Sequence, residues 1–178
     1  MKGPFVTDME AIRERARAKM HDGAVTDAYK ADRQQVLQVL NEVLATEIVC
    51  VLRYKNHYYM ASGIHGEQVA GEFLTHANEE QAHADLIAER ITQLGGRPNL
   101  NPEGLATRSH AQYAEGETLK EMIEENLVAE RIAIETYSEI IRWLGDDDTT
   151  TRRIIETILA EEEHHADDMA SLLEQFGG

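Results

Sequence analysis

The chain contains 178 residues, a length that suits one domain with a single hydrophobic core. Its net charge of −16 argues against general nucleic-acid binding, because a phosphate backbone would be repelled, and favours the attraction of cations. No run of 18 apolar residues predicts a membrane-spanning helix, and the single cysteine excludes an internal disulfide framework. With three prolines and 28% charged residues, the composition is typical of an all-α protein.

The first segment with helical periodicity is short, covering about residues 8–20, and His21-Asp22-Gly23 ends it. It contains four basic residues between Arg13 and Lys19. We interpret these as a solvated helix face, with a DNA-contacting arm as the alternative. We assign residues 1–30 to an N-terminal extension and 31–178 to one helical bundle.

Four longer segments with a 3.6-residue period follow, and each has recognisable end signals. They cover about 31–63, 67–95, 117–144 and 149–176. Glycines stop the first three helices. The acidic triplet Asp146-Asp147-Asp148 supplies turn and N-cap groups for the fourth, an interpretation that we prefer to a metal site.

The connection lengths predict the topology of these helices. The first two long helices are joined tightly, as are the last two, so each pair is expected to form an antiparallel hairpin. About 22 residues, including Pro98, Pro102 and Gly104, separate the hairpins. A helix of 25 residues is about 38 Å long, and the linker in extended form covers that length. The linker is therefore expected to run along the bundle as one long crossover.

Each long segment carries an apolar stripe that is interrupted near its middle by Glu, or by Glu with His. In chain order the stripes are Val36, Leu40, Val43, Glu47, Val51, Tyr54 and Tyr58; Val69, Phe73, His76, Glu80, His83, Ile87 and Leu94; Leu119, Ile123, Glu130, Ile134, Tyr137, Ile141 and Leu144; and Ile155, Ile158, Glu162, His165, Met169 and Leu172. Four buried carboxylates repel one another unless cations neutralise them. Two divalent metal ions supply four positive charges, and neutral imidazoles complete their coordination.

The spacing of these polar residues is repeated along the chain. Each half has a single Glu, a tyrosine seven residues later, and a Glu-x-x-His motif 32 or 33 residues after the single Glu. The Glu-x-x-His spacing places both side chains on one helix face. The two hairpins therefore resemble copies related by a pseudo-twofold axis, each donating half of a dimetal site. The predicted ligands are Glu47, Glu80, His83, Glu130, Glu162 and His165.

A second Glu-x-x-His pair, Glu161 and His164, overlaps the predicted one in the last helix. The stripe through Ile158 and Met169 favours Glu162 and His165 instead. We therefore expect loss of Glu161 or His164 to have little effect.

With these residues in place, the chain resembles the bacterioferritin branch of the ferritin-like superfamily from about residue 34 to residue 173. The resemblance is carried by Leu-Ala-Thr-Glu47, Glu80-Gln-Ala-His83-Ala-Asp, Ala-Glu-Arg-Ile91, Arg-Pro-Asn-Leu100, Asn-Leu-Val-Ala-Glu130 and Glu162-Glu-His-His165. It implies a ferritin-like antiparallel four-helix bundle with one long crossover, here preceded by a short N-terminal helix. It further implies two iron ions per chain, one bound by Glu47 and His83 and the other by Glu130 and His165. Glu80 and Glu162 would bridge the ions, and Tyr54 matches a family tyrosine that hydrogen-bonds or donates an electron near them.

Three departures from the bacterioferritin pattern modify these expectations. Gln81 occupies the position of the haem-ligating methionine, so we expect no haem. The chain ends at Gly178 without a fifth short helix, and about 30 residues precede the first long helix. Both features are similar to the twelve-subunit mini-ferritins related to the starvation-induced DNA-binding (Dps) proteins. A homo-oligomeric cage of twelve subunits is therefore favoured over one of 24.

The function favoured by this resemblance is that of a ferroxidase, which oxidises Fe(II) with O2 or H2O2 and stores Fe(III) in the cage, protecting against oxidative stress. One alternative is a rubrerythrin-like di-iron peroxidase without storage, although one cysteine cannot form the four-cysteine iron site that usually feeds such enzymes. A DNA-protecting shell is another, which the negative charge disfavours. Manganese or zinc would accept the same ligands.

The start of the chain has no apolar segment of signal-peptide length, so we expect a cytoplasmic location. In that compartment we expect Cys50 to remain a packed thiol.

Overall fold

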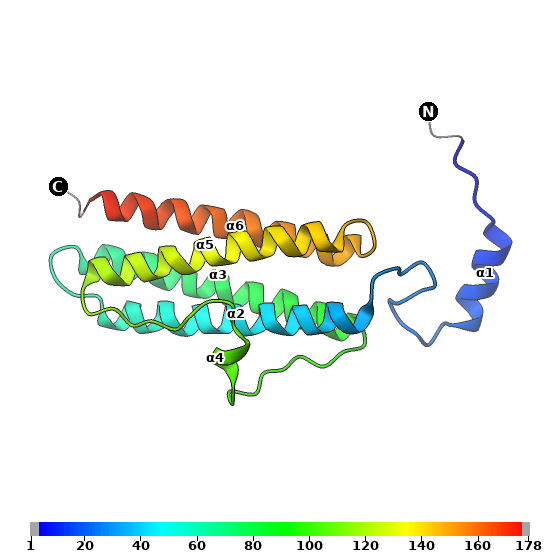
Figure 1. The fold of residues 1–178 in the computed structure, drawn as a ribbon, viewed down its shortest axis with the longest axis horizontal. Coiled ribbons are helices and arrows are strands. Elements are labelled where there is room, and N and C mark those ends of the chain that lie inside the picture. The colour runs from blue at the N-terminus through cyan, green and yellow to red at the C-terminus, as the bar shows by residue number, and fades with distance from the viewer. Residues whose placement is uncertain (1–3, 176–178) are drawn as a thin grey trace.

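The computed structural model describes residues 4–175, and every regular element in that range is a helix. The helices are α1 (Met9–Ala18), α2 (Arg33–Met60), α3 (Gly66–Gln93), α4 (Leu105–Arg108), α5 (Leu119–Leu144) and α6 (Thr149–Glu174). The four long helices lie side by side in an antiparallel bundle, as Figure 1 shows. The predicted fold class is confirmed. The short helix α4 was not predicted, and the predicted end of the last helix at residue 176 lies outside the described residues.

The helix ends follow the chemistry expected from the sequence. Asp32 caps α2 by accepting hydrogen bonds from two backbone amides, and Thr118 and Glu121 form a capping box at the start of α5. Asp148 accepts a hydrogen bond from the backbone amide of Thr151 at the start of α6, so the predicted N-cap role of the acidic triplet is confirmed. These caps mark the starts of α2, α5 and α6, whereas α3 begins without a side-chain cap.

The crossover runs along the bundle between the end of α3 and the start of α5, and α4 lies within it (Figure 1). A buried polar network ties the crossover to the bundle. Arg53 on α2 donates to Oδ1 of Asn126 on α5 at 2.9 Å and to the backbone oxygen of Gln112 at 3.2 Å. His57 contacts the backbone oxygen of Ala114 at 3.0 Å. Arg53 thereby links α2 both to the crossover and to α5, which belongs to the other hairpin.

Two apolar clusters occupy the two ends of the bundle core. One gathers around Leu40, Ile87 and Ile155, and the other around Phe73 and Met169. Burial of such side chains contributes about 1.5–3 kcal/mol each. The polar centre lies between these clusters, so apolar packing fixes its helices on both sides.

The predicted stripes match the buried faces of α3 and α6, but the stripe of α5 needs a correction. Ile134 and Ile141 are only half-buried, whereas Ala133 and Ile140 point into the core. The reason is that α5 turns a slightly different face inward than an even 3–4 alternation implies, since the helix has 3.6 residues per turn. Tyr58 on α2 is also half-buried rather than fully inside.

The N-terminal helix α1 has no buried residues and stands apart from the bundle in Figure 1. Asp27 pairs with Arg15 and Lys19, which accounts for two of the four basic residues. The segment after α1 is attached to the bundle, because Tyr29 donates to Oδ2 of Asp148 at 3.0 Å. Cys50, as predicted, is buried.

One helix among the described residues is long and apolar enough to span a membrane by length and composition. It is α2, in which 56% of the most apolar window is buried inside the bundle. The same helix carries the buried polar side chains of Glu47 and Arg53. The apolarity of α2 is therefore that of a core helix.

Candidate metal centre

Each long helix contributes to a polar centre halfway along the bundle. Glu47 comes from α2 and Glu130 from α5, and α3 and α6 each add a Glu and a His one helical turn apart. None of the six side chains belongs to a residue more than 1% exposed. The structure thus brings together every metal ligand predicted from the sequence, while metal binding itself stays a prediction.

The six side chains form two overlapping groups, each with one imidazole and three carboxylates. Their ligand atoms lie within 4.8 Å of one another in each group. The first group is Glu47, Glu80, His83 and Glu162, and the second is Glu80, Glu130, Glu162 and His165. Because both groups include Glu80 and Glu162, the arrangement suits two neighbouring ions that share two carboxylates.

The hydrogen bonds show which carboxylates have one oxygen available for a metal ion and which have both oxygens available. Tyr137 on α5 donates to Oε1 of Glu47 on α2, and Tyr54 on α2 donates to Oε1 of Glu130 on α5. Each of these glutamates keeps one oxygen for a metal ion. Glu80 and Glu162 have no such partner and keep both oxygens.

Eight buried ligand atoms in the centre have no hydrogen-bond partner: one oxygen each of Glu47 and Glu130, both oxygens of Glu80 and Glu162, and Nδ1 of His83 and His165. Buried polar atoms are normally paired, since an unpaired one costs about 1–3 kcal/mol. Eight such atoms converging on one place fit two divalent cations with four ligands each.

The separations between ligand atoms support this fit. Nδ1 of His83 lies 3.4 Å from Glu47 and 3.2 Å from Glu162, and Nδ1 of His165 lies 3.4 Å from Glu162 and 3.7 Å from Glu80. Ligands about 2.1 Å from a tetrahedral metal ion are about 3.4 Å apart. Three of these four separations are longer than usual nitrogen–oxygen hydrogen bonds and close to the spacing of metal ligands.

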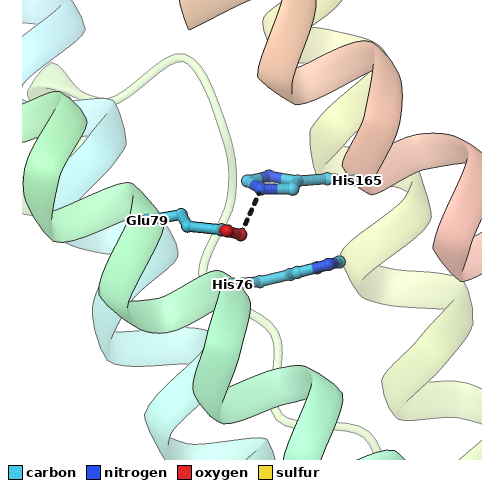
Figure 2. Close-up of side chains that lie close together, drawn as sticks. All are labelled: His76, Glu79 and His165. Carbon is cyan, nitrogen blue, oxygen red and sulfur yellow. Dashed lines mark hydrogen bonds and ion pairs between the residues drawn. The ribbon is translucent and has the colours of Figure 1, made fainter.

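The outer nitrogens of the two imidazoles contact carboxylates at the edge of the centre. Nε2 of His83 lies 2.7 Å from Oε2 of Glu161, and Nε2 of His165 lies 2.9 Å from Oε2 of Glu79. Figure 2 shows Glu79 reaching from α3 to the ring of His165. A carboxylate on the outer nitrogen fixes the orientation of a metal-binding imidazole and increases its basicity.

Glu79 and Glu161 were not assigned this role from the sequence. Each directly precedes a predicted bridging glutamate, so the full repeated motif is Glu-Glu-x-x-His, found at 79–83 and 161–165. That repetition is the sequence feature from which the roles of Glu79 and Glu161 could have been predicted. The expectation that Glu161 is dispensable is at odds with its contact to His83. His164 is exposed, in line with the choice of His165 for the centre.

The buried charges shift the pKa values of the centre in opposite directions. Burial and repulsion from neighbouring carboxylates raise the pKa of Glu47 and of Glu130. For Glu80, burial opposes ionisation, but contacts with His165 and His83 lower the pKa overall. Burial also opposes charging of the imidazoles, yet their carboxylate contacts raise the pKa of His83 and bring that of His165 to about 11. Without a metal ion, bound protons therefore offset part of the negative charge of the carboxylates.

The pseudo-twofold symmetry is broken by His76, one turn before Glu80 on α3. The equivalent position before Glu162 on α6 is the apolar Ile158. The ring of His76 stacks on that of His165, with centroids 4.1 Å apart, and the two rings lie nearly parallel in Figure 2. Burial and the neighbouring His165 lower the pKa of His76 to about 4. Only one half of the centre has this additional imidazole.

A four-helix bundle whose hairpins jointly enclose four carboxylates and two imidazoles defines the class of dinuclear carboxylate proteins. Residues 37–177 match the ferritin-like domain of the Ferritin family, and the chain belongs to this family.

Two relatives illustrate the sequence similarity. The bacterioferritin of Desulfovibrio desulfuricans is 30% identical over 114 residues, which are 64% of this chain and 60% of that protein. The DNA protection during starvation protein 2 of Bacillus anthracis is 33% identical over 92 residues, which are 51% of this chain and 63% of that protein. The matched regions thus span less than two thirds of these curated relatives.

Solved structures extend the comparison to the fold. The dodecameric thioferritin of Bacteroides fragilis, described as a bacterioferritin-related protein, has a TM-score of 0.79 and 34% identity, covering 83% of this chain and 89% of that one. BfrA of Mycobacterium tuberculosis, a bacterioferritin, has a TM-score of 0.69 and 29% identity, covering 79% and 85%. Dps from Thermosynechococcus elongatus, at 23% identity and a TM-score of 0.75, covers 79% and 90% and shares the fold.

Proposed function

We propose that this protein is a ferroxidase that oxidises ferrous ions at the metal centre and stores the ferric product in an oligomeric cage. The observation that carries the proposal is the group of eight buried ligand atoms without hydrogen-bond partners. Membership of the ferritin-like family supports iron over the manganese or zinc that the same donors accept.

In this proposal the ferrous ions are substrates, and each residue has a defined task. Glu47 and His83 hold one ion, Glu130 and His165 hold the other, and the remaining two glutamates bridge them. Two ferrous ions give up two electrons, which with two protons reduce O2 to H2O2 or H2O2 to two water molecules. Holding both ions next to each other allows one oxidant molecule to take both electrons.

The tyrosines next to the centre have related but unequal tasks. Tyr54 and Tyr137 each orient one carboxylate by donating a hydrogen bond across the bundle. Tyr54 also lies 3.2 Å from Nδ1 of His76, whereas Tyr137 has no equivalent imidazole because Ile158 stands there. Tyr54 is therefore the tyrosine that we propose as an electron donor to the oxidised centre.

Storage requires a closed shell, because a single 20.0 kDa bundle has no interior for a mineral. Closed symmetric assemblies are the usual outcome for homo-oligomers. The similarity to a dodecameric thioferritin favours twelve subunits, a particle of about 240 kDa, over a 24-subunit cage. The exposed Tyr59 and Trp143 are candidates for burial between subunits. The proposed location is the cytoplasm.

A rubrerythrin-like peroxidase without storage and a DNA-protecting shell remain the alternatives. The peroxidase alternative predicts a small oligomer that turns over with an external reductant and accumulates no ferric mineral. The DNA alternative depends on the exposed basic face of α1, part of which is neutralised by Asp27. The charge of −16 opposes it.

The decisive experiment combines ferrous titration without oxygen, oxidation after oxygen or H2O2 is added, and light scattering of the product. We expect two ferrous ions at the dimetal centre of each chain, rapid formation of ferric absorbance, and an iron-filled particle of about 240 kDa. A dimer that oxidises iron but retains none would favour the peroxidase. A particle of about 480 kDa would favour the 24-subunit cage.

The matched variants for this experiment are Glu162→Ala and Glu163→Ala. Both remove one negative charge from adjacent positions on α6, but only Glu162 is buried in the centre, since Glu163 is exposed. We expect Glu162→Ala to abolish rapid oxidation and Glu163→Ala to retain it. Equal activity of the two variants would reject the proposed centre.

A further inference from the structure

A second cluster of possible metal ligands lies beside the centre, between α3 and α6. It consists of Glu72, His76 and Asp168, whose ligand atoms lie within 4.8 Å of one another. None of the three belongs to the centre itself. Nε2 of His76 lies 3.4 Å from Oδ2 of Asp168 and 3.6 Å from Oε1 of Glu72.

The orientation of His76 directs Nε2 towards these carboxylates. Tyr54 donates its hydroxyl proton to Glu130, so its oxygen accepts a hydrogen bond from Nδ1 of His76, 3.2 Å away. A neutral imidazole that donates from Nδ1 has no proton on Nε2. With this tautomer, Nε2 and the two carboxylates are all acceptors that face one another, and a cation between them would satisfy all three.

The separations in this cluster are those of metal ligands. Hydrogen bonds from nitrogen to oxygen are usually about 2.7–3.2 Å long, whereas ligands of a tetrahedral ion with bonds of about 2.1 Å lie about 3.4 Å apart. Distances of 3.4 and 3.6 Å around His76 are close to the second value, as are most of those around His83 and His165. The cluster thus repeats the spacing of the dimetal centre with fewer ligands.

The cluster also spans the boundary between solvent and core. The side chains of Glu72 and Asp168 are 41% and 30% exposed, whereas that of His76 is 1% exposed. An exposed imidazole, that of His164, lies 3.6 Å from the same oxygen of Asp168. On the inner side, His76 stacks on His165, a ligand of the proposed centre. An ion held here would be accessible from solvent and adjacent to the centre.

We propose that Glu72, His76 and Asp168 form a third site for a divalent transition-metal ion, through which ferrous ions reach the centre. Two carboxylates and one imidazole suit Fe(II), Co(II) and Zn(II), and leave coordination positions for water or for His164. The pseudo-equivalent half of the bundle lacks the site, because Ile158 replaces the imidazole. Ions therefore approach from the His165 side. This delivery role depends on the proposed ferroxidase function, whereas metal binding at the site does not.

The test is the number of Co(II) or Zn(II) ions bound per chain by the full-length protein in equilibrium dialysis. The test variant is Glu72→Gln with Asp168→Asn, and the matched control is Glu67→Gln with Asp167→Asn. Both remove one negative charge from α3 and one from α6, so general attraction of cations falls equally. Glu67 and Asp167 are exposed and belong to neither cluster. We expect three ions for the wild type and the control, and two for the test variant.

A variant without the dimetal centre, Glu80→Ala with Glu162→Ala, isolates the third site. We expect it to bind one ion, and to lose that ion when Glu72→Gln and Asp168→Asn are added. No bound ion in the centre-deficient variant, or equal numbers for test and control variants, would overturn the third site. Failure of the wild type to oxidise iron while it still binds three ions would reject the ferroxidase function instead.

Delivery is tested by the rate of ferrous oxidation as a function of ferrous concentration. We expect the test variant to need a several-fold higher concentration for half-maximal rate, with the same maximal rate, because the centre itself is intact. An unchanged half-maximal concentration in a variant that has lost the third ion would overturn the delivery role.

Discussion

The carboxylate of Glu161 lies 2.7 Å from Nε2 of His83, on the side of the ring that faces away from the metal centre. Glu79 has the same relationship to His165 in the other half of the bundle. Each contact joins α3 to α6, so each imidazole is oriented by the opposite hairpin. The two hairpins therefore depend on each other for the geometry of their own ligands.

We predict that Glu161→Gln and Glu79→Gln each weaken metal binding by about 10- to 100-fold, because the outer carboxylate no longer orients the imidazole or increases its basicity. Isothermal titration with Zn(II) measures the effect. Glu163→Gln, which removes an exposed charge from the same turn of α6, is the control and should bind as the wild type does. Equal affinities for all three variants would mean that the outer carboxylates have no such role.

Substitution of a glutamate that binds one ion should remove fewer ions than substitution of a glutamate that bridges both. Glu47→Ala deletes one oxygen ligand from one group and leaves Glu80, Glu130, Glu162 and His165 intact, so we expect the centre to hold one ion instead of two, beside the ion of the third site. Glu80→Ala deletes a ligand shared by both groups, and we expect paired binding to disappear. Native mass spectrometry of chains loaded with Co(II) counts the ions. Equal losses in both variants would contradict the bridging role.

Metal affinity should fall as the pH falls. Without metal, the pKa values of Glu47, Glu130, His83 and His165 are all raised, so these groups bind protons more tightly than the free side chains do. A metal ion must displace those protons, and binding therefore becomes more favourable as the pH rises. Calorimetry in buffers with different ionisation enthalpies measures the protons released. No release, or tighter binding at low pH, would show that the ligands are already deprotonated.

The buried ion pair between Arg90 and Asp148 should govern stability in acid. Nη2 of Arg90 lies 3.0 Å from Oδ1 of Asp148, and the same carboxylate accepts hydrogen bonds from Thr151 and Tyr29. Burial opposes ionisation, but these hydrogen bonds and Arg90 hold the pKa of Asp148 below its usual value. Because the folded pKa is below the unfolded one, the stabilisation is present at neutral pH and is lost as the pH falls through the acidic range.

We therefore expect Asp148→Ala to reduce the free energy of unfolding by about 3–5 kcal/mol at neutral pH, since it leaves Arg90 buried without its partner. This decrease in the free energy of unfolding should become smaller at acidic pH. Denaturant unfolding followed by circular dichroism measures it, and Asp147→Ala at the neighbouring exposed position is the control. A loss below about 1 kcal/mol would mean that the pair behaves as an exposed one.

The protein should bind no stoichiometric haem. The resemblance to bacterioferritins implies that Gln81 stands at the position of a haem-ligating methionine, and an amide is a poor axial ligand. Its side chain instead donates to Oδ1 of Asp85 at 3.1 Å. The visible spectrum of the purified protein checks this, and a strong Soret band with one haem per two chains would contradict it. Gln81→Met is the informative variant, because a gain of haem would identify the missing ligand as the cause.

The sequence by itself determined the four long helices, the long crossover and the six residues predicted to bind metal. All of these depend on short-range periodicity: apolar stripes at helical spacing, glycine stops, and a Glu-x-x-His motif repeated at matched distances. Such features can be recognised in the sequence because the residues on one helix face are defined by local spacing alone.

Only the tertiary structure decided which residues support those ligands. Glu161 contacts His83 and Tyr137 contacts Glu47 across 78 and 90 positions of the chain, and no local spacing predicts pairs at that distance. The inward face of α5, with Ala133 in place of Ile134, was likewise set by packing against the other helices. The cluster of Glu72, His76 and Asp168 depends on the register between α3 and α6. That register is fixed by the whole core, since one helix must fit the side chains of three others.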